Sequence, residues 1–473
     1  MSVAGATALH ALGAQEALAL FRTRALSPVE LMEAVLARAE AVEPAVNALP
    51  FTHPEHALAQ ARAAEARYAG GGDGTRPLDG LPVAVKEEAP IAGLPNTYGS
   101  LVHADVVATE TAPFVERILA AGGIVHAQTA TPEYSCTATT HSRLWGATRN
   151  PWDPSRAVGG SSGGSAAALA SGTAPLATGS DIGGSIRIPS AYCGTVGFKP
   201  PPGRVPEMAP FNRDYYCHEG PMARSVADVA LLQNVISGPH HADVASLRPK
   251  LWIPGTPESV AGWKVAVCVT LGDYAVDADW AANTLAVADA LRAAGAAVRE
   301  VELPWTAEQI GHAALCHLGT TMGAGIGALL DEHRDQLNDY TIALAERGRA
   351  LPQSALLEGM AIEGALYPAL GRVLEDHRAL ICPTMAVGPW EAGVTVGLDQ
   401  MTREAMTLPF NMFSNCPVMA MPSGRAADGL PTGVQVVGPT FDDVAVFAIA
   451  AAIERERPWP RLAPTPAPGG AAA

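Results

Sequence analysis

The chain has 473 residues, of which 48% are hydrophobic and 16% are charged, and its formal net charge is -16. The charged fraction lies below the roughly 25% of ordinary soluble domains, which favours a compact protein with a large buried core over a disordered one. The acidic balance argues against nucleic acid and anionic membrane surfaces as partners, because both attract basic patches.

The cysteines indicate a reducing compartment. Their number is odd, they are scattered along the chain and no two form a C-x-x-C pair: Cys136, Cys193, Cys217, Cys268, Cys316, Cys382 and Cys416. This usage is typical of free thiols rather than of a disulfide framework. The N-terminus lacks a basic stretch before an apolar one, and no apolar run approaches the ~18 residues of a membrane span. We therefore expect a cytoplasmic protein without a signal peptide or a membrane helix.

The first elements are predicted by their end signals. Ser27 as N-cap, Pro28 in the first turn and Glu30 in a capping box predict a helix that starts at Pro28. Further along, Asp79 and Gly80 predict a turn, and the short apolar stretch after them predicts a strand that ends at Lys86.

Helices then alternate with apolar strands. Residues 111–129 and 278–303 each show a helical pattern, a glycine stop and an apolar strand. More apolar strands are predicted within residues 263–270, 379–387, 417–424 and 433–439. Helices alternating with apolar strands predict an α/β protein whose sheet is covered on its faces.

Residues 157–172, "AVGGSSGGSAAALASG", raise the main functional question. A flexible linker has this composition, but the stretch runs directly into helix-forming alanines and lies between apolar segments. A phosphate-binding P-loop would need a Gly-Lys-Ser/Thr ending, and a dinucleotide fingerprint would need G-x-G-x-x-G. Neither pattern is present here.

A third alternative is the nucleophile elbow of α/β-hydrolases. Gly159, Ser161 and Gly163 satisfy G-x-S-x-G, which would make Ser161 the nucleophile and would require a later acid and histidine. Asp376 and His377 stand in that order, but no local pattern favours them.

A second glycine–serine segment, "GSDIGGSIRIPSAYCGTVGFKP", offers a different chemistry. Ser185 follows two glycines, which allow backbone N–H groups to converge as an oxyanion hole requires. Two serines and Lys86 together can carry out acyl transfer without a histidine.

On these segments the chain resembles the amidase signature family. The matching pieces are "GLPVAVKEEAPIAGLPNTYGS", "GATRNPWDPSRAVGGSSGGSAAALASG", "GSDIGGSIRIPSAYCGTVGFKP", "EGPMARSVADVALL" and "LPFNMFSNCPVMAMP", followed by "LPTGVQVVGPTFDD". They stand in the order of the family and span about residues 25 to 445. The resemblance implies a mixed central sheet sandwiched by helices, in a single domain over residues 1–462.

Within that domain we expect a helical segment over about residues 1–60, a catalytic core over 61–225, a variable substrate-side region over 226–375 and a return to the core over 376–462. Residues 463–473 hold little to bury and are predicted to be a disordered tail.

The resemblance also implies roles for single residues. Ser185 would be the acylated nucleophile, Lys86 the general base, and Ser161, reached through a cis peptide, the proton relay between them. The oxyanion hole would be formed by the N–H groups of Ile182, Gly183, Gly184 and Ser185, and the substrate would contact Tyr134, Gly160, Phe211 and Tyr215. No metal or other cofactor is implied, and a homodimer remains open.

The chain departs from the family pattern after the lysine, where two acidic residues, Glu87 and Glu88, follow instead of one. An ordinary lysine has a pKa of about 10.4 and must be desolvated to act as a base at neutral pH. We expect the strand to end and Glu88 to turn away from Lys86; otherwise activity would require alkaline pH. Asp181 and Arg187, beside the nucleophile, are expected to hold its loop.

The predicted function is therefore hydrolysis of amide C–N bonds through an acyl-enzyme. The segment "EMAPFNRDYYCHEG" is aromatic-rich, and the resemblance places it over the entrance of the site, which favours apolar or aryl amides. Esters and carbamates (urethanes) share the same acyl chemistry. Two alternatives remain: the glutamine-hydrolysing subunit of an amidotransferase, and a catalytically silent member of the family that only binds.

Overall fold

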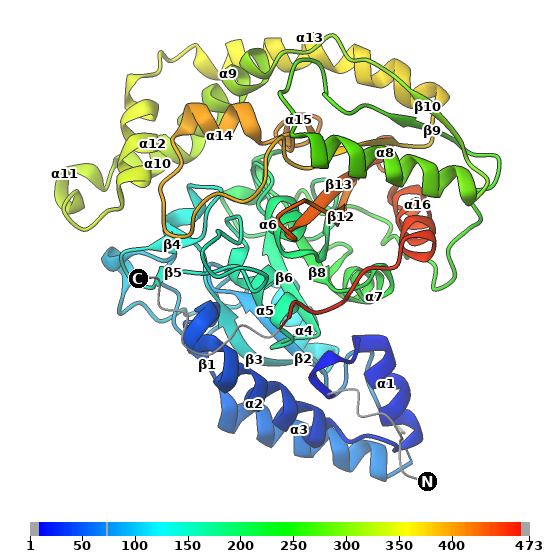
Figure 1. Cartoon of the computed structure of the whole chain (residues 1–473). Helices are drawn as coiled ribbons and strands as arrows, with labels where there is room; N and C mark the ends of the chain where they lie inside the picture. Colours follow the sequence, from blue (N-terminus) through cyan, green and yellow to red (C-terminus); the bar gives the residue numbers. More distant parts are fainter. Residues whose placement is uncertain (1–8, 72–73, 465–473) are drawn as a thin grey trace.

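The core of the protein is one mixed β-sheet. The computed structural model describes residues 9–71 and 74–464. In this part of the chain an 11-stranded sheet has the order β1-β3-β2-β6-β8-β7-β12-β13-β11-β9-β10 (Figure 1). Its strands are β1 (Phe51–Thr52), β2 (Pro82–Lys86), β3 (Ile124–Thr129), β6 (Leu176–Ser180), β7 (Val196–Lys199), β8 (Glu219–Ala223), β9 (Lys264–Val267), β10 (Ala297–Glu300), β11 (Leu380–Pro383), β12 (Val418–Arg425) and β13 (Pro431–Val437). A small second sheet pairs β4 (His141–Ser142) with β5 (Gly146–Ala147).

Strand directions explain why the sheet is mixed. Strand β2 runs parallel to β3 and β6, and β9 runs parallel to β10 and β11, whereas the strands between these two groups pair antiparallel. The expected mixed sheet flanked by helices is confirmed.

Helices cover both faces of the sheet. They are α1 (Ala14–Thr23), α2 (Pro28–Val46), α3 (Pro54–Ala69), α4 (Pro113–Ala120), α5 (Gly163–Ser171), α6 (Arg187–Cys193), α7 (Val226–Ile236), α8 (Ala278–Ala293), α9 (Ala307–Leu318), α10 (Ala324–Gly327), α11 (Leu330–His333), α12 (Asp339–Ala350), α13 (Ala355–Asp376), α14 (Leu398–Glu404), α15 (Pro409–Met412) and α16 (Asp443–Glu456). Helices α4, α7, α8 and α16 pack on one face, and α5 and α6 on the other. In Figure 1, α9 to α13 lie at the opposite end of the molecule from α2 and α3.

The pleat of β2 decides where Lys86 points. Val83 and Val85 belong to the core beneath α4 and α7, whereas Ala84 packs with the residues of α5 on the other face. Because side chains alternate along a strand, Lys86 shares the face of Ala84 and therefore points towards α5. This is the face on which both candidate serines lie.

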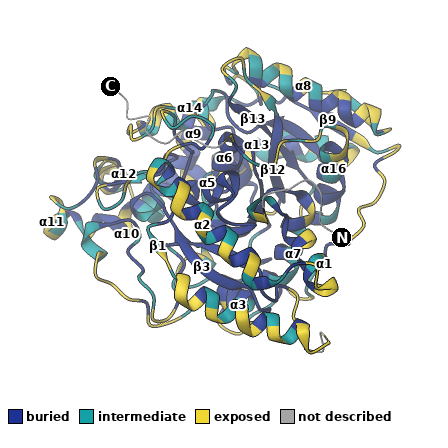
Figure 2. Cartoon of the chain, turned by 60° about the horizontal axis from the view of Figure 1, so that its bottom comes forward, coloured by how far each residue is buried: buried dark blue, intermediate teal, exposed yellow. Residues whose placement is uncertain are grey.

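Most of the predicted elements are confirmed. The capping box of Ser27 and Glu30 is present at the start of α2, and β2 ends at Lys86. The glycine-serine stretch is not a linker: α5 is buried along its whole length, as Figure 2 shows by its dark blue ribbon in the interior.

Two further expectations concern the ends of the chain and membranes. Ala463, in the predicted tail, is buried and its N–H donates to Ala170 O at 2.8 Å, while residues 465–473 lie outside the described part. Among the described residues, no helix combines the length and the apolar character that a membrane crossing requires.

Candidate active site

Ser161 and Ser185 lie in two loops that each lead into a buried helix. Ser161 precedes α5 and Ser185 precedes α6, and the N–H of Ser162 donates to Ser185 O at 3.1 Å, which holds the loops together. The peptide bond between Gly160 and Ser161 is cis, as the resemblance implied. Ser161 is fully buried, whereas Ser185 is 7% exposed at the edge of a cavity.

Close packing explains the glycines that start α5. A Cβ on Gly163 would lie 2.2 Å from Thr140 Oγ1, and a Cβ on Gly164 would lie 2.3 Å from Ala130 N. Real Cβ atoms do not approach other atoms so closely, so only glycine allows α5 to pack against residues 130–140. The composition that looks like a linker thus serves a tightly packed helix.

Lys86 is the centre of a polar network. Its side-chain nitrogen Nζ lies 2.7 Å from Ser161 Oγ, 2.8 Å from Ser180 Oγ and 3.3 Å from Ser135 Oγ. The Lys86 side chain is only 1% exposed. Lys86 and Ser161 therefore lie in hydrogen-bond contact, while Ser185 Oγ makes no hydrogen bond to another described residue.

The prediction that Glu88 turns away from Lys86 is wrong. The strand does end at Lys86, but a tight turn, closed by the hydrogen bond from Ala89 N to Lys86 O at 3.0 Å, folds the chain back. As a result Glu88 Oε1 lies 2.8 Å from Lys86 Nζ, and the side chain of Glu88 is 16% exposed.

Two hydroxyl groups complete the surroundings of Glu88. Ser180 Oγ donates to Glu88 Oε1, and Ser135 Oγ donates to Glu88 Oε2. Burial by itself would raise the pKa of Glu88, but the charge of Lys86 and the hydrogen bonds from Lys86, Ser135 and Ser180 outweigh it and lower this pKa below its ordinary value. The carboxylate form is therefore the stable one.

Asp181 and Arg187 hold the loop of Ser185, as expected. Their ion pair spans 2.8 Å and both side chains are fully buried. Asp181 also accepts the N–H of Gly184 at 2.9 Å and that of Ile186 at 3.2 Å. Burial alone would raise the pKa of Asp181, but Arg187 and Asn411 hold it well below its usual range.

The backbone around Ser185 differs in one respect from the predicted oxyanion hole. Because the N–H of Gly184 already donates to Asp181 Oδ1, it is occupied in this structure. The N–H groups of Ile182, Gly183 and Ser185 find no acceptor among the described residues. Gly184 has φ +123, and a Cβ there would lie 2.1 Å from Thr407 Oγ1, so this position requires glycine.

An apolar cavity adjoins Ser185. It is lined near the loops by Ser135, Cys136, Thr137, Ala138, Gly160, Ile182, Gly183 and Ile188, and from the helical region by Leu315, Leu318, Met322, Leu344, Leu398, Met401, Ala405 and Leu408. Among the described residues, no charged side chain lines it. A group that enters this cavity is therefore favoured if it is apolar.

The predicted substrate contacts lie in different places. Gly160 lines the cavity beside Ser185, whereas Tyr134 does not, although the residues that follow it do. Phe211 is 44% exposed, and Tyr215 donates its hydroxyl to Glu363 Oε2 at 2.9 Å. Ser135, which sequence reasoning missed, contacts both Lys86 and Glu88.

The α/β-hydrolase alternative finds no support in the geometry. The ring of His377 lies 2.8 Å from Val373 O of the preceding helix turn, and Asp376 ends α13. Neither residue contacts Ser161, whose hydroxyl instead meets Lys86.

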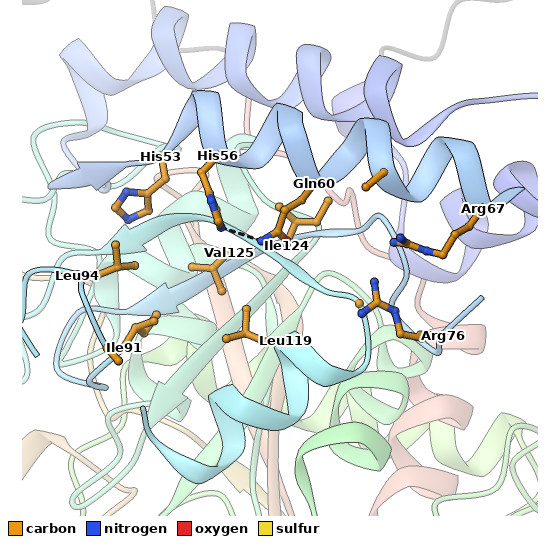
Figure 3. Close-up of a pocket in the computed structure, with 13 residues that line it drawn as sticks. His53, His56, Gln60, Arg67, Arg76, Ile91, Leu94, Leu119, Ile124 and Val125 are labelled. Atoms are coloured by element: carbon orange, nitrogen blue, oxygen red, sulfur yellow. Dashed lines mark hydrogen bonds between the residues drawn. The ribbon is translucent and has the colours of Figure 1, made fainter. Parts of the chain in front are cut away.

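A larger cavity, of about 590 Å³, lies between α3, α4 and β3 (Figure 3). Figure 3 shows His53 and His56 at one end and Arg67 and Arg76 at the other. These side chains pair within the protein: His53 with Gln128, His56 with Gln60, and both arginines with Asp79. Nothing in the cavity therefore requires a ligand, and Lys86, Ser161 and Ser185 do not line it.

Comparisons with known proteins place the chain among amidases and their relatives. An acylamidase of Rhodococcus erythropolis is 33% identical over 95% of this chain and 96% of its own length. One glutamyl-tRNA(Gln) amidotransferase subunit, from Chloroflexus aggregans, is 32% identical over 96% of this chain and 98% of its own. The solved structure of a bacterial aryl acylamidase of the amidase signature family is 29% identical with a TM-score of 0.89, over 95% of this chain and 97% of that one.

The family model Amidase matches residues 30–447. The chain therefore belongs to the amidase signature family, and the resemblance seen in its motifs is confirmed.

Proposed function

We propose that this protein hydrolyses the C–N bond of carboxamides that carry apolar groups, through an acyl-enzyme on Ser185. The observation that carries the proposal is the contact of Lys86 Nζ with Ser161 Oγ at 2.7 Å, next to a loop that presents Ser185 to an apolar cavity. Nucleophile, relay and base are thus all available without a histidine or a metal.

The reaction follows from these positions. Ser185 Oγ attacks the amide carbonyl carbon while its proton passes to Ser161 and the proton of Ser161 passes to neutral Lys86. The free N–H groups of Ile182, Gly183 and Ser185 stabilise the negative oxygen that forms. The C–N bond then breaks as the proton returns through Ser161 to the leaving amine. Water finally attacks the acyl-enzyme by the same route and releases the acid.

The apolar lining of the cavity supports amides with an aliphatic or aryl group as the substrate class. Two of the relatives are an acylamidase and an aryl acylamidase, which agrees with this choice. Short esters and aryl carbamates belong to the same proposal, because their carbonyl carbon is attacked in the same way.

A second candidate is the glutamine-hydrolysing subunit of an amidotransferase, which the similarity to such subunits favours. Glutamine carries an ammonium and a carboxylate, and both need charged or polar partners when they are desolvated. In the part of the chain that the structure describes, no charged residue lines the cavity beside Ser185, which argues for the apolar substrates.

The test is labelling with a serine-directed fluorophosphonate, followed by peptide mapping and by assays on anilides, carboxamides, carbamates and glutamine. We expect the adduct on Ser185 and its loss in Ser185→Ala, while Ser161→Ala is labelled more slowly. Ser155→Ala, on an exposed loop, is the control. An adduct on Ser161 would contradict the proposal, and so would activity that EDTA abolishes and zinc restores. A chain that neither labels nor turns over any substrate would be a binding member of the family.

A further inference from the structure

The network around Lys86 contains one group that the proposed mechanism does not use. Glu88 places a carboxylate oxygen 2.8 Å from Lys86 Nζ, the atom that must be a neutral amine before it can take a proton from Ser161. A carboxylate at this distance favours the charged form of an amine. The proposed base is therefore paired directly with a carboxylate.

The hydrogen bonds of the network match a charged Lys86 paired with a charged Glu88. The hydroxyl groups of Ser135 and Ser180 donate to Glu88, so their oxygen atoms are left to accept from Lys86 Nζ. Together with Ser161 Oγ these acceptors can take every N–H of an ammonium group. A neutral amine or a protonated Glu88 would leave part of this hydrogen-bond network unsatisfied, which is costly beside a Lys86 side chain that is only 1% exposed.

We propose that Glu88 is a positioning residue that holds Lys86 as an ammonium ion in the resting enzyme, so that acylation of Ser185 begins only after this ion has lost a proton. The inference rests on the proposed function. The proton balance is simple: the ammonium gives one proton to hydroxide, forming water and the neutral amine, and the amine then takes the proton of Ser161. The expected result is an enzyme with an alkaline rate profile.

Other titratable groups face the same network, and their effects on the pH profile must be distinguished from the effect of Glu88. Glu219 of β8 lies opposite Ser180 in the sheet register, and burial, with repulsion from Glu207 and Glu88, raises its pKa well above the ordinary value. Burial, with repulsion from nearby carboxylates including Glu88, raises the pKa of Glu207 to about 8. Burial and Glu88 also raise the pKa of Tyr98.

Three more groups belong to these surroundings. The pKa of the Cys136 and Cys217 thiols is raised, first by burial and then by neighbouring carboxylates that include Glu88. Burial raises the pKa of Glu87, whose carboxylate is turned the other way and accepts the N–H of Thr97. Of the carboxylates that surround the site, only Glu88 contacts Lys86 in the described structure.

The experiment measures the second-order rate of fluorophosphonate labelling at Ser185 against pH, which needs no knowledge of the substrate. In the wild type this rate should rise with pH, and we call that rise the rising limb. In Glu88→Gln we expect the rising limb to lie about 1–3 pH units lower, because an opposite charge at this range shifts a titration by that amount. Glu40→Gln, an exposed carboxylate on α2, is the matched control and should follow the wild type. Glu207→Gln tests the group near pH 8 and should leave the limb in place.

Two further variants keep the inference falsifiable if Glu88→Gln does not fold. Glu88→Ala removes the charge and should lower the limb similarly, whereas Glu88→Asp keeps the charge on a shorter arm and should lower it less. The role of Glu88 is overturned if neither Glu88→Gln nor Glu88→Ala moves the rising limb. It is also overturned if Glu207→Gln moves the limb as far as these two variants do. Failure of the proposed function looks different: Ser185 would not be labelled at any pH.

Discussion

The buried ion pair of Asp181 and Arg187 connects the loop of Ser185 with distant parts of the chain. Besides Asp181, the guanidinium of Arg187 donates to Gln435 Oε1 at 2.6 Å and to Asn411 Oδ1 at 2.7 Å. Such a buried ion pair adds little to the stability of the fold when it is compared with well-packed apolar residues. Removing one partner, however, leaves the other as an unpaired buried charge. Its role here is to fix the backbone that presents Ser185.

Asp181→Asn should therefore be strongly destabilising, by about 3–5 kcal/mol at neutral pH, because Arg187 keeps its charge without a counterion. Because the pKa of Asp181 is lower in the folded protein than in the unfolded chain, ionised Asp181 stabilises the fold. This contribution is fully present above about pH 4, the pKa in the unfolded chain, and is lost as the pH falls further. Urea unfolding at pH 7 and pH 3 measures both effects. We expect the variant to lose less stability than the wild type on acidification, with the exposed Asp331→Asn as control. If the variant and the wild type lost equal stability between pH 7 and pH 3, Asp181 would not be the source of this contribution.

Lys86 should matter more for amides than for esters. An amine leaves only when it is protonated, and in the proposed mechanism that proton comes from Lys86, whereas an alkoxide leaves with less help. Lys86→Ala should be made together with Glu88→Gln, so that no unpaired carboxylate remains in the site. Relative to Glu88→Gln alone, kcat/KM should fall by about 10²–10⁴ for an anilide, and by less for the matched ester. An equal loss on both substrates would contradict the role of Lys86 as proton donor to the amine.

At the scale of elements, α5 shows how a helix of small residues positions chemistry. Every residue of α5 is buried, and the helix packs between the sheet and residues 130–140. Small side chains reduce the distance between backbones, which lets the loop before α5 carry Ser161 to Lys86. The alanines and glycines of this segment are therefore a packing requirement rather than a sign of flexibility.

Two glycine-to-alanine substitutions test this interpretation with opposite signs. Gly163→Ala should destabilise and inactivate the protein, because its Cβ would lie 2.2 Å from Thr140 Oγ1 and 2.5 Å from Val158 Cγ2. Gly364→Ala, in the exposed middle of α13, meets no atom within 4 Å and should stabilise by about 0.5–1 kcal/mol. Thermal unfolding and labelling of Ser185 in both variants give the comparison. If Gly163→Ala were tolerated, close packing would not be the reason for this glycine.

At the scale of the whole molecule, a polar and aromatic cluster joins the substrate-side helices to the core. Tyr215 and Tyr216 both donate to Glu363 of α13, and His317 Nε2 of α9 lies 2.7 Å from Asp214 Oδ1. The rings of Tyr216 and His317 stack at 3.7 Å with an interplanar angle of 5°. The aromatic segment that was expected over the entrance is thus fixed to α9 and α13, the helical region that supplies part of the cavity wall.

The cavity should set the size of the group that the enzyme accepts. Met322 lies in the π-helical segment Gly319–Gly323 and lines the same cavity as Ser185. Met322→Ala should raise kcat/KM for amides with bulkier apolar groups relative to small ones, with about 0.8 kcal/mol at stake for each CH₂ that is buried. A series of anilides of increasing acyl length measures this preference, and Met360→Ala, exposed on α13, is the control. An unchanged ranking would mean that the variable group binds elsewhere.

Much of this protein follows from local sequence. The capping box at Ser27, the strand that ends at Lys86 and the glycine stop before β3 depend on a few neighbouring residues, and each is present in the structure. The two glycine–serine motifs are equally local, so the family and the mixed sheet could be predicted from them. These features are determined by backbone preferences and short spacings, which a sequence displays directly.

Contacts between distant segments could be decided only by the tertiary structure. Glu88 was expected to turn away because the strand ends at Lys86, yet its carboxylate returns to Lys86 since Ser135 and Ser180, from other parts of the chain, donate to it. The occupied N–H of Gly184 likewise depends on the side chain of Asp181. The direction of a side chain after a turn is set by whichever partners the fold brings within hydrogen-bond distance, and no spacing along the chain encodes that choice.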